Sequence, residues 1–254
     1  MPGPALVAEM YGRDYLDHLS DIYGEDAERV PEPTLRELKA YAPGTFLDYG
    51  CGRGELLERA AEAGWRTVGV EFDERLAKDV AARIVTTVIT PTEALRDFSA
   101  AADVIHLGDV VEHLTDPLTQ LSEILRLLKP GGALIAVGPL EGNRNLFWLG
   151  LGAWRRLRGS PQADMPPWHV TLATASGQLR LFARANLMPV KFVVDEAWWP
   201  APARLDRAVL ASPRALALHG LRGVSRAASR TMSHRRWGNR YVYVGTLIAV
   251  PVEI

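Results

Sequence analysis

Cysteine is nearly absent from this sequence: Cys51 stands alone, so no internal disulfide can form. The six histidines are scattered, and with a single cysteine they do not have the spacing of zinc ligands. No stretch reaches the roughly 18 uninterrupted apolar residues of a membrane-spanning helix, and the first four residues lack the charged and apolar blocks of a signal peptide. We therefore expect a cytosolic protein without a bound metal.

Net charge is also close to zero, at −1, but the two halves of the chain differ sharply. Residues 1–141 carry 13 Lys and Arg against 25 Asp and Glu, whereas residues 142–254 carry 16 against 5. The basic half predicts a surface that faces an anionic partner, and the alternative is an ordinary solvated surface facing the acidic half. With 254 residues, 48% of them hydrophobic, the chain fits one globular domain with insertions.

Short apolar runs alternate with helical patterns of about 10–15 residues, an alternation typical of a parallel sheet built from βαβ units. The expected strands are Thr45–Tyr49, Thr67–Glu71, Ile84–Ile89, Val104–Leu107, Ala133–Val137, Val190–Val194 and Tyr241–Val250. Helices are expected to begin near Glu55, Glu74, Glu93, Pro117 and Ala175. A turn at Lys129–Gly132 is expected to close the fourth of these α/β units and to lead into the fifth strand.

The two ends of the chain depart from this alternation. The N-terminal residues 1–41 are expected to be helical, at Tyr11–Glu28 and Thr34–Tyr41. Asn143–Arg158 mixes aromatic and basic residues in an amphipathic pattern, and a loop is expected at Ser160–Trp168. The stretch Pro202–Arg240 is rich in arginine and alanine and is expected to be mostly helical.

A glycine-rich turn follows the first expected strand and reads Asp48-Tyr49-Gly50-Cys51-Gly52-Arg53-Gly54. Alternate glycines let the backbone turn tightly and approach a ligand, so a nucleotide-like ligand is expected there. The dinucleotide fingerprint G-x-G-x-x-G would need a third glycine at position 55, where the chain has Glu55, so NAD is disfavoured. The Gly-Lys-Ser/Thr of the P-loop is missing as well, which excludes ATP or GTP hydrolysis by that route.

This loop resembles the first motif of the class I S-adenosylmethionine-dependent methyltransferases, acidic-x-G-x-G-x-G. The resemblance continues at Glu71, where the family keeps an acid for the two ribose hydroxyls, and a carboxylate can accept both hydrogen bonds. The stretch Asp103–Leu114 looks like the fourth-strand motif that lines the methionine part of the cofactor, and Thr92–Glu93 sits where the family often contacts adenine. The similarity covers roughly residues 34–140.

The resemblance implies a Rossmann-like, doubly wound α/β fold with seven strands, mostly parallel, and one antiparallel C-terminal strand. It also implies one domain with a helical cap (1–41), a cofactor-binding core (42–139) and an acceptor-side half (140–254) that includes a lid (143–169) and a basic helical insert (200–240). The implied S-adenosylmethionine-binding residues are Asp48, Tyr49, Gly50, Cys51, Gly52, Gly54, Glu71, Phe72, Glu93, Gly108 and Asp109.

Two histidines are candidates for proton transfer. If the segment is helical, Asp109, Glu112 and His113 share one face, so a metal site must be considered, whereas the resemblance makes His113 a substrate-side or structural residue. His169 resembles a histidine that faces the active site in relatives. For both, a structural or hydrogen-bonding role stays open beside proton transfer. Cys51 is expected to be a packing residue, because no base is positioned to activate it.

The resemblance is nearest to the ubiquinone-type and natural-product small-molecule methyltransferases, and it implies O-methylation of a small, lipid-linked or glycan-linked anionic acceptor. A nucleic-acid acceptor is not expected, because no RNA-binding module surrounds the basic residues. The alternatives are a non-catalytic scaffold with the same fold and, disfavoured, an NAD-dependent dehydrogenase. The two basic stretches leave open a lid over the site, a homodimer contact or peripheral membrane association.

Overall fold

The computed structural model describes residues 32–84, 86–157, 169–198 and 201–248. The expected helix at Tyr11–Glu28 and the expected loop at Ser160–Trp168 lie outside these ranges. Among the helices within them, none combines the length and the apolar character needed to cross a bilayer.

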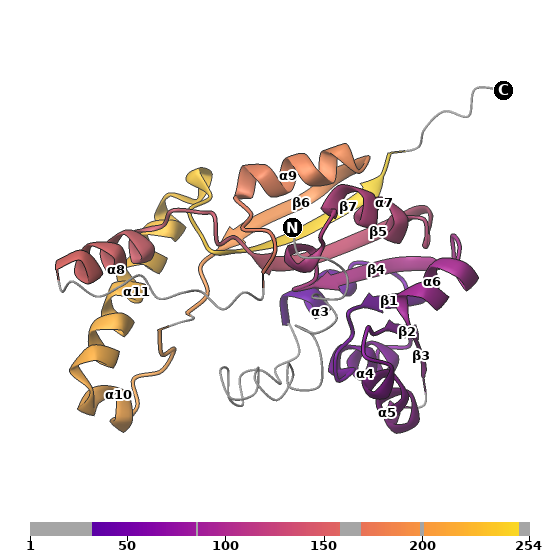
Figure 1. The fold of residues 1–254 in the computed structure, drawn as a ribbon, viewed down its shortest axis with the longest axis horizontal. Helices are drawn as coiled ribbons and strands as arrows, with labels where there is room; N and C mark the ends of the chain where they lie inside the picture. The colour runs from indigo at the N-terminus through magenta and orange to yellow at the C-terminus, as the bar shows by residue number, and fades with distance from the viewer. Residues whose placement is uncertain (1–31, 85, 158–168, 199–200, 249–254) are drawn as a thin grey trace.

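A seven-stranded sheet forms the centre of the molecule, in the order β3-β2-β1-β4-β5-β7-β6 (Figure 1). The strands are β1 (Thr45–Tyr49), β2 (Arg66–Val70), β3 (Thr87–Ile89), β4 (Ala102–Gly108), β5 (Leu128–Pro139), β6 (Leu187–Asp195) and β7 (Arg240–Leu247). Strands β1 to β5 pair in parallel, and β7 runs antiparallel to both β5 and β6. The predicted sheet with one antiparallel C-terminal strand is confirmed. The strand order reverses between β1 and β4, and ligands of such sheets bind beyond the carboxyl ends of the strands at that point.

Helices cover both faces of the sheet, because successive strand residues point to opposite sides. The helices are α3 (Glu32–Leu38), α4 (Glu55–Glu62), α5 (Glu74–Ile84), α6 (Pro91–Asp97), α7 (Pro117–Leu125) and α9 (Ala175–Arg184). Phe46 of β1 is buried in one cluster with Leu57 of α4. The next residue, Leu47, belongs to a second cluster with Leu121 of α7 and Phe182 of α9. Two hydrophobic cores thus hold the sheet between helix layers.

Two boundaries differ from the sequence prediction. Ile84 is the last residue of α5 and not the first residue of β3, because its side chain packs with the α4 side of the core. Lys129–Gly132 does not form a turn between α7 and β5. It lies inside β5, where the register against β4 shifts between Ala102 and Val104, and Gly131 takes a left-handed φ of 78°.

Three helices form a lobe beyond the carboxyl ends of the parallel strands (Figure 1). They are α8 (Leu146–Leu157), α10 (Arg207–Ala211) and α11 (Pro213–Thr231), and the last two lie within the stretch Pro202–Arg240. Phe147 and Leu151 of α8 are buried in a cluster of their own, against which Leu221 of α11 packs. Leu151 is thus buried inside this lobe, whereas Leu149 lies on its surface with 55% exposure.

A buried ion pair fixes the lobe to the end of β6. The guanidinium group of Arg222 on α11 donates to the Glu196 carboxylate, and both side chains are fully buried. Ser229 donates to the other carboxylate oxygen at 2.6 Å, and the Arg222 guanidinium lies 3.5 Å from the centre of the Phe147 ring. Charge pairing and a cation–π contact thus join α8, α11 and β6 at one point.

Candidate active site

The glycine loop after β1 adopts a backbone that side chains disfavour. Gly50, Gly52 and Gly54 have φ values of 82°, 51° and 81°, all in the left-handed region. A Cβ atom on Gly50 would lie 2.7 Å from the Val110 side chain, so that glycine is required for packing. A Cβ on Gly52 would meet nothing within 4 Å. The space in front of Gly52 is therefore open to a ligand.

Glu71, immediately after β2, closes the other side of this loop. Its carboxylate accepts hydrogen bonds from the backbone N–H groups of Gly52 at 2.9 Å, Phe72 at 2.7 Å and Asp73 at 3.1 Å. Burial raises the pKa of Glu71, and the three backbone donors oppose that rise without cancelling it. Phe72 and Asp73 both donate to Oε1, whereas Gly52 alone donates to Oε2, so the group is oriented and Oε2 keeps a lone pair for a further donor.

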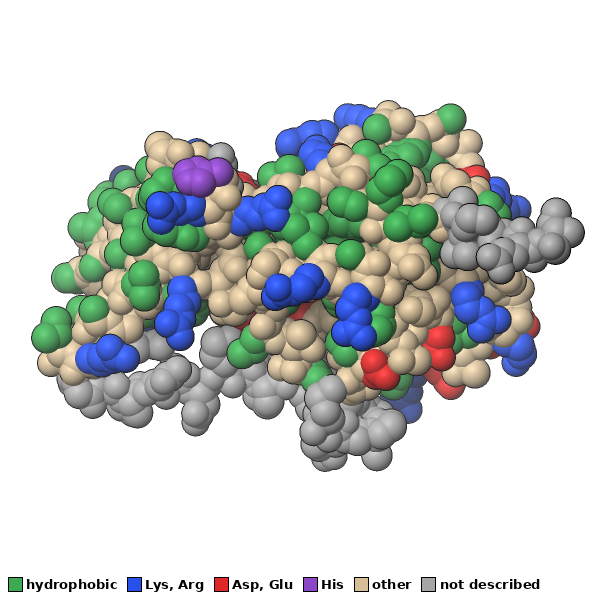
Figure 2. All heavy atoms as spheres, turned by 90° about the horizontal axis from the view of Figure 1, so that it is seen from above, with side chains coloured by type: hydrophobic (Ala, Val, Ile, Leu, Met, Phe, Trp, Pro, Cys, Tyr) green, Lys and Arg blue, Asp and Glu red, His purple; other side chains and the backbone are tan. Residues whose placement is uncertain are grey.

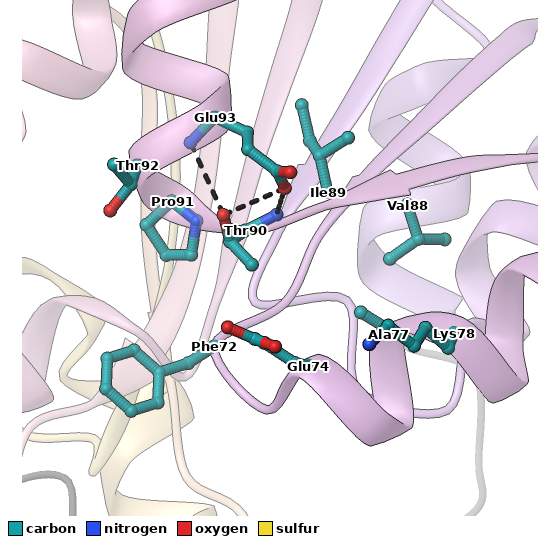
Figure 3. A pocket seen from close by; sticks show the side chains of 10 residues that line it. All are labelled: Phe72, Glu74, Ala77, Lys78, Val88, Ile89, Thr90, Pro91, Thr92 and Glu93. Carbon is teal, nitrogen blue, oxygen red and sulfur yellow. Dashed lines mark hydrogen bonds between the residues drawn. The ribbon is translucent and has the colours of Figure 1, made fainter.

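A cavity of about 780 Å³ opens beside Glu71, between the ends of β2 and β3 (Figure 3). Phe72 and Glu93, both expected near the cofactor, line it. The Glu93 carboxylate also completes a capping box at the start of α6, where it accepts from the Thr90 N–H at 2.8 Å. These hydrogen bonds from Thr90 lower the pKa of Glu93. The capping box therefore holds the Glu93 side chain in place, and Glu93 lines the cavity in that position.

Asp48 lies at the buried centre of the sheet, with its carboxylate 2.7 Å from Nδ1 of His106 on β4. Nε2 of the same imidazole lies 3.1 Å from the Thr34 hydroxyl on α3. His106 was not singled out from the sequence, although it follows the Asp103 of the fourth-strand motif by three residues. These two hydrogen bonds link the start of the glycine loop to α3. The side chains of Asp48, His106 and Thr34 are all buried.

The other residues expected near the cofactor lie around this centre. Burial raises the pKa of Tyr49 to about 12. Burial is also the largest cause that raises the pKa of the Cys51 thiol, which stays protonated and packs in the core cluster beside α4, in line with a packing role. Gly108 cannot be replaced by a larger residue without displacing His106, because a Cβ there would lie 2.5 Å from the imidazole ring.

Asp109 begins a second group of polar side chains, at the carboxyl end of β4. Its φ of 52° is left-handed, so the segment Asp109–His113 is not a continuous helix, and only Val111–His113 forms a 3₁₀ turn. One guanidinium nitrogen of Arg240 lies 2.8 Å from each Asp109 carboxylate oxygen. The Asp109 side chain is 53% exposed, and the charge and hydrogen bond of Arg240 lower its pKa against the opposing effect of partial desolvation.

Glu112, His113 and His169 come together next to this pair. The atoms that they offer as ligands all lie within 4.8 Å of one another, and the two imidazole rings are 5.0 Å apart between centres. Nδ1 of His169 lies 2.7 Å from the carboxylate of Glu141, which follows β5. The geometry is consistent with the prediction that His113 and His169 both belong to the site. Glu141 and Arg240 were not predicted as site residues, because no local sequence pattern marks them and each is brought here by a distant strand.

The same cluster is a candidate metal site among the described residues. It differs from the trio considered from the sequence, because Asp109 is engaged by Arg240 and His169 takes its place. Two imidazoles and a carboxylate are a ligand set that suits zinc or iron. The expectation of no bound metal stays a prediction.

Glu112 is the most buried carboxyl of this group, 4% exposed, and its Oε1 atom has no hydrogen-bond partner among the described residues. Burial raises its pKa well above the usual range, and the nearby Asp109 charge adds to that rise. Among the described residues the hydroxyl of Tyr241 is also buried without a hydrogen-bond partner, and burial and the Glu112 charge raise its pKa too. Such unpaired polar atoms are typical of a functional site.

The substitution Glu112→Gln is expected to stabilise the fold in a pH-dependent way. A carboxyl with a higher pKa in the folded than in the unfolded chain costs stability once it ionises. The free energy of unfolding therefore falls as pH rises from the ordinary value of 4.5 through the raised one. Glutamine keeps the shape without the charge. Above this range we expect a gain on the order of 1–3 kcal/mol in thermal unfolding, and none at acidic pH. Glu123→Gln, at an exposed site, is the control; an equal, pH-independent gain in both variants would contradict the assignment.

A family model for the methyltransferase domain matches residues 23–190. The chain belongs to the methyltransferase family. Among curated relatives, the ubiquinone biosynthesis O-methyltransferase of Cereibacter sphaeroides is 40% identical over 96 residues, which cover 35% of this chain and 39% of the relative. The enzyme of the same name from Ruegeria pomeroyi is 35% identical and covers 61% of this chain and 65% of its own length. The matches thus span less than two thirds of these relatives.

Solved structures agree with the fold of this methyltransferase. A Burkholderia thailandensis 1,6-didemethyltoxoflavin-N1-methyltransferase superposes with a TM-score of 0.58 at 17% identity, covering 98% of this chain and 92% of that one. An S-adenosylmethionine-dependent methyltransferase from Archaeoglobus fulgidus gives 0.57 at 18% identity, with 92% and 99% coverage. The predicted class I S-adenosylmethionine-dependent methyltransferase is confirmed.

The methyltransferase has residues that fit S-adenosylmethionine. The open space at Gly52 follows β1, the oriented carboxylate of Glu71 follows β2, and the cavity lined by Phe72 reaches the end of β3. When bound, this cofactor supplies a methyl group on a sulfonium, which is already activated for displacement. The protein's task is to hold it and to exclude water.

Glu71→Ala is expected to weaken S-adenosylmethionine binding by about 1–3 kcal/mol, because the ribose hydroxyls lose charge-assisted acceptors. The loop also loses the bond from the Gly52 N–H, which adds disorder at the binding site. Isothermal titration calorimetry measures the affinity directly. Glu62→Ala, an exposed acid at the end of α4, is the matched control and should bind like the wild type. Unchanged affinity in Glu71→Ala would remove Glu71 from the cofactor site.

Proposed function

We propose that this methyltransferase transfers the methyl group of S-adenosylmethionine to an oxygen atom of a small, lipid-linked or glycan-linked anionic acceptor. The observation that carries the proposal is the hydrogen-bonded pair of Glu141 and His169 at the carboxyl edge of the sheet, 2.7 Å apart. A hydroxyl acceptor must lose its proton as the new bond forms, whereas a neutral amine needs little such help. A base beside the methyl-donor site is therefore informative about the acceptor atom.

The pair is arranged as a base with an orienting acid. The carboxylate of Glu141 holds Nδ1 of His169, which favours the tautomer with the proton on Nδ1 and leaves the Nε2 lone pair for an incoming hydroxyl. His169 keeps 24% of its side chain exposed, whereas Glu141 keeps 12%, so the imidazole is the accessible partner. His113 and Glu112 offer atoms within 4.8 Å of His169, and we expect His113 to contact the acceptor as well.

Two further observations support the choice of acceptor. The curated relatives are named ubiquinone biosynthesis O-methyltransferases, so by name they methylate oxygen. The excess of arginine over acids in residues 142–254 suits an acceptor that carries negative charge. Neither observation depends on the histidine pair.

The test is a methyl-transfer assay with labelled S-adenosylmethionine on fractions of a cell extract, followed by identification of the methylated atom. A methyl group labelled with carbon-13 has a chemical shift that separates oxygen from nitrogen and carbon attachment. We expect an O-methyl product. A methyl group on nitrogen or carbon would overturn the choice of atom, and absence of S-adenosylmethionine binding would overturn the activity.

A further inference from the structure

The lobe of α8, α10 and α11 presents apolar side chains on its outside. The inner side of the lobe is occupied by internal contacts. Its core is formed by Phe147, Leu151 and Ala201, and Arg222 is paired with Glu196. The outward apolar side chains come from all three helices and the segment before α10: Leu149, Trp154, Leu157, Leu205, Leu210, Leu216 and Val224, with exposures from 39% to 87%. Exposed apolar residues gathered on one part of a monomer mark an interaction surface.

The same outer surface is positively charged. Residues 201–240 hold nine arginines and one acid, Asp206, and the Asp206 carboxylate is occupied by the backbone N–H of Val209 at 2.8 Å as the cap of α10. Within the described residues, the arginine ion pairs of this stretch are those of Arg222 and Arg240, which leaves Arg204, Arg207, Arg214 and Arg230 outside any ion pair. Figure 2 shows basic and hydrophobic side chains side by side over the lobe, while acidic side chains gather toward the other end.

Leucine and arginine interleaved on a helical surface match the chemistry of an anionic bilayer. Apolar side chains enter the headgroup boundary, and guanidinium groups stay at the level of the lipid phosphates. A second copy of this chain matches less well, because a twofold contact through this surface would bring arginines of both copies together. Nucleic acid would use the arginines but would leave the leucines exposed.

We propose that the outer surface of α8, α10 and α11 docks the protein onto an anionic lipid bilayer. The lobe projects beyond the carboxyl ends of the parallel strands, so docking would hold the catalytic edge of the sheet toward the membrane (Figure 1). The docking is a property of the surface and does not depend on which acceptor the enzyme methylates. Vesicle binding therefore tests it apart from the proposed function.

The experiment is vesicle flotation of the full chain with two lipid compositions, phosphatidylcholine alone and phosphatidylcholine with phosphatidylglycerol, at low and high salt. The double variant R207E/R214E reverses two exposed charges of the lobe, and R180E/R184E reverses two exposed charges of α9 as the matched control. We expect flotation only with phosphatidylglycerol, loss at high salt, and binding about tenfold or more weaker in the lobe variant alone.

Three outcomes would overturn the proposal. The first is recovery of the wild type in the protein fraction with both vesicle types. The second is an equal loss of binding in both double variants, which would assign the binding to general positive charge. A wild-type dimer in light scattering that R207E/R214E dissociates, without any vesicle binding, would assign the surface to a second copy. Circular dichroism of both variants verifies that the helices are retained.

Discussion

Replacing Arg222 by alanine is expected to lower the free energy of unfolding by about 3–5 kcal/mol. The substitution leaves the buried Glu196 carboxylate with the Ser229 hydroxyl as its one side-chain donor among the described residues, and it removes the cation from the Phe147 ring. An isolated buried charge is far more costly than the pair it came from. The loss should fall first on α8 and α11, because Arg222 joins these two helices to the end of β6.

Urea unfolding followed by circular dichroism measures the total effect, and hydrogen exchange locates it. We expect faster exchange in Leu146–Leu157 and Pro213–Thr231 than in the sheet. Arg214→Ala, on the same helix but exposed, should change stability by less than about 0.5 kcal/mol. The double variant R222M/E196Q removes both charges and should be more stable than Arg222→Ala. If the double variant is the less stable of the two, the unpaired charge is not the cause.

The fold was predictable as far as local patterns specify it. The alternation of apolar runs with amphipathic helical patterns indicated the five parallel strands. Strands and helices can be told apart there because the hydrophobic residues of each recur with a different period. Two boundaries were not predictable from period alone. The run from Ile84 to Ile89 is β-branched and looks like a single strand, yet Ile84 completes the buried face of α5. The glycines at 131 and 132 suggest a turn, yet they lie within β5, at the point where its register against β4 shifts.

The cofactor side of the site was predictable because its residues are close in sequence and have fixed roles. The glycines and Glu71 lie within one strand–helix–strand unit, so spacing alone brings them together. The acceptor side depends on pairings across the sheet. Arg240 meets Asp109 because β7 inserts between β5 and β6, and Glu141 meets His169 although 28 residues separate them. His106 was missed for the same reason, since its partners Asp48 and Thr34 lie on other elements.

His169→Ala is expected to lower kcat about 100- to 10,000-fold while S-adenosylmethionine affinity stays unchanged. The reason is the geometry of the proposed base: Glu141 holds Nδ1 at 2.7 Å, so Nε2 is the atom left to accept the acceptor's proton. Glu141→Gln should cause a smaller loss, because the imidazole stays but its tautomer and orientation are less well defined. His234→Ala, an exposed histidine outside the site, is the matched control and should keep full activity.

Rescue separates proton transfer from a merely structural role. If the missing group is a base, added imidazole should restore part of the activity of His169→Ala, since the cavity left by the side chain admits a free imidazole. Imidazole should not restore activity to Glu141→Gln in the same way.

Chelation tests the competing role of the cluster, in which Glu112, His113 and His169 hold a metal with their ligand atoms within 4.8 Å of one another. Activity that EDTA abolishes and a divalent cation restores would overturn the base assignment, because His169 would then act through the metal. Activity that is indifferent to EDTA and partly restored by imidazole is the result that we expect.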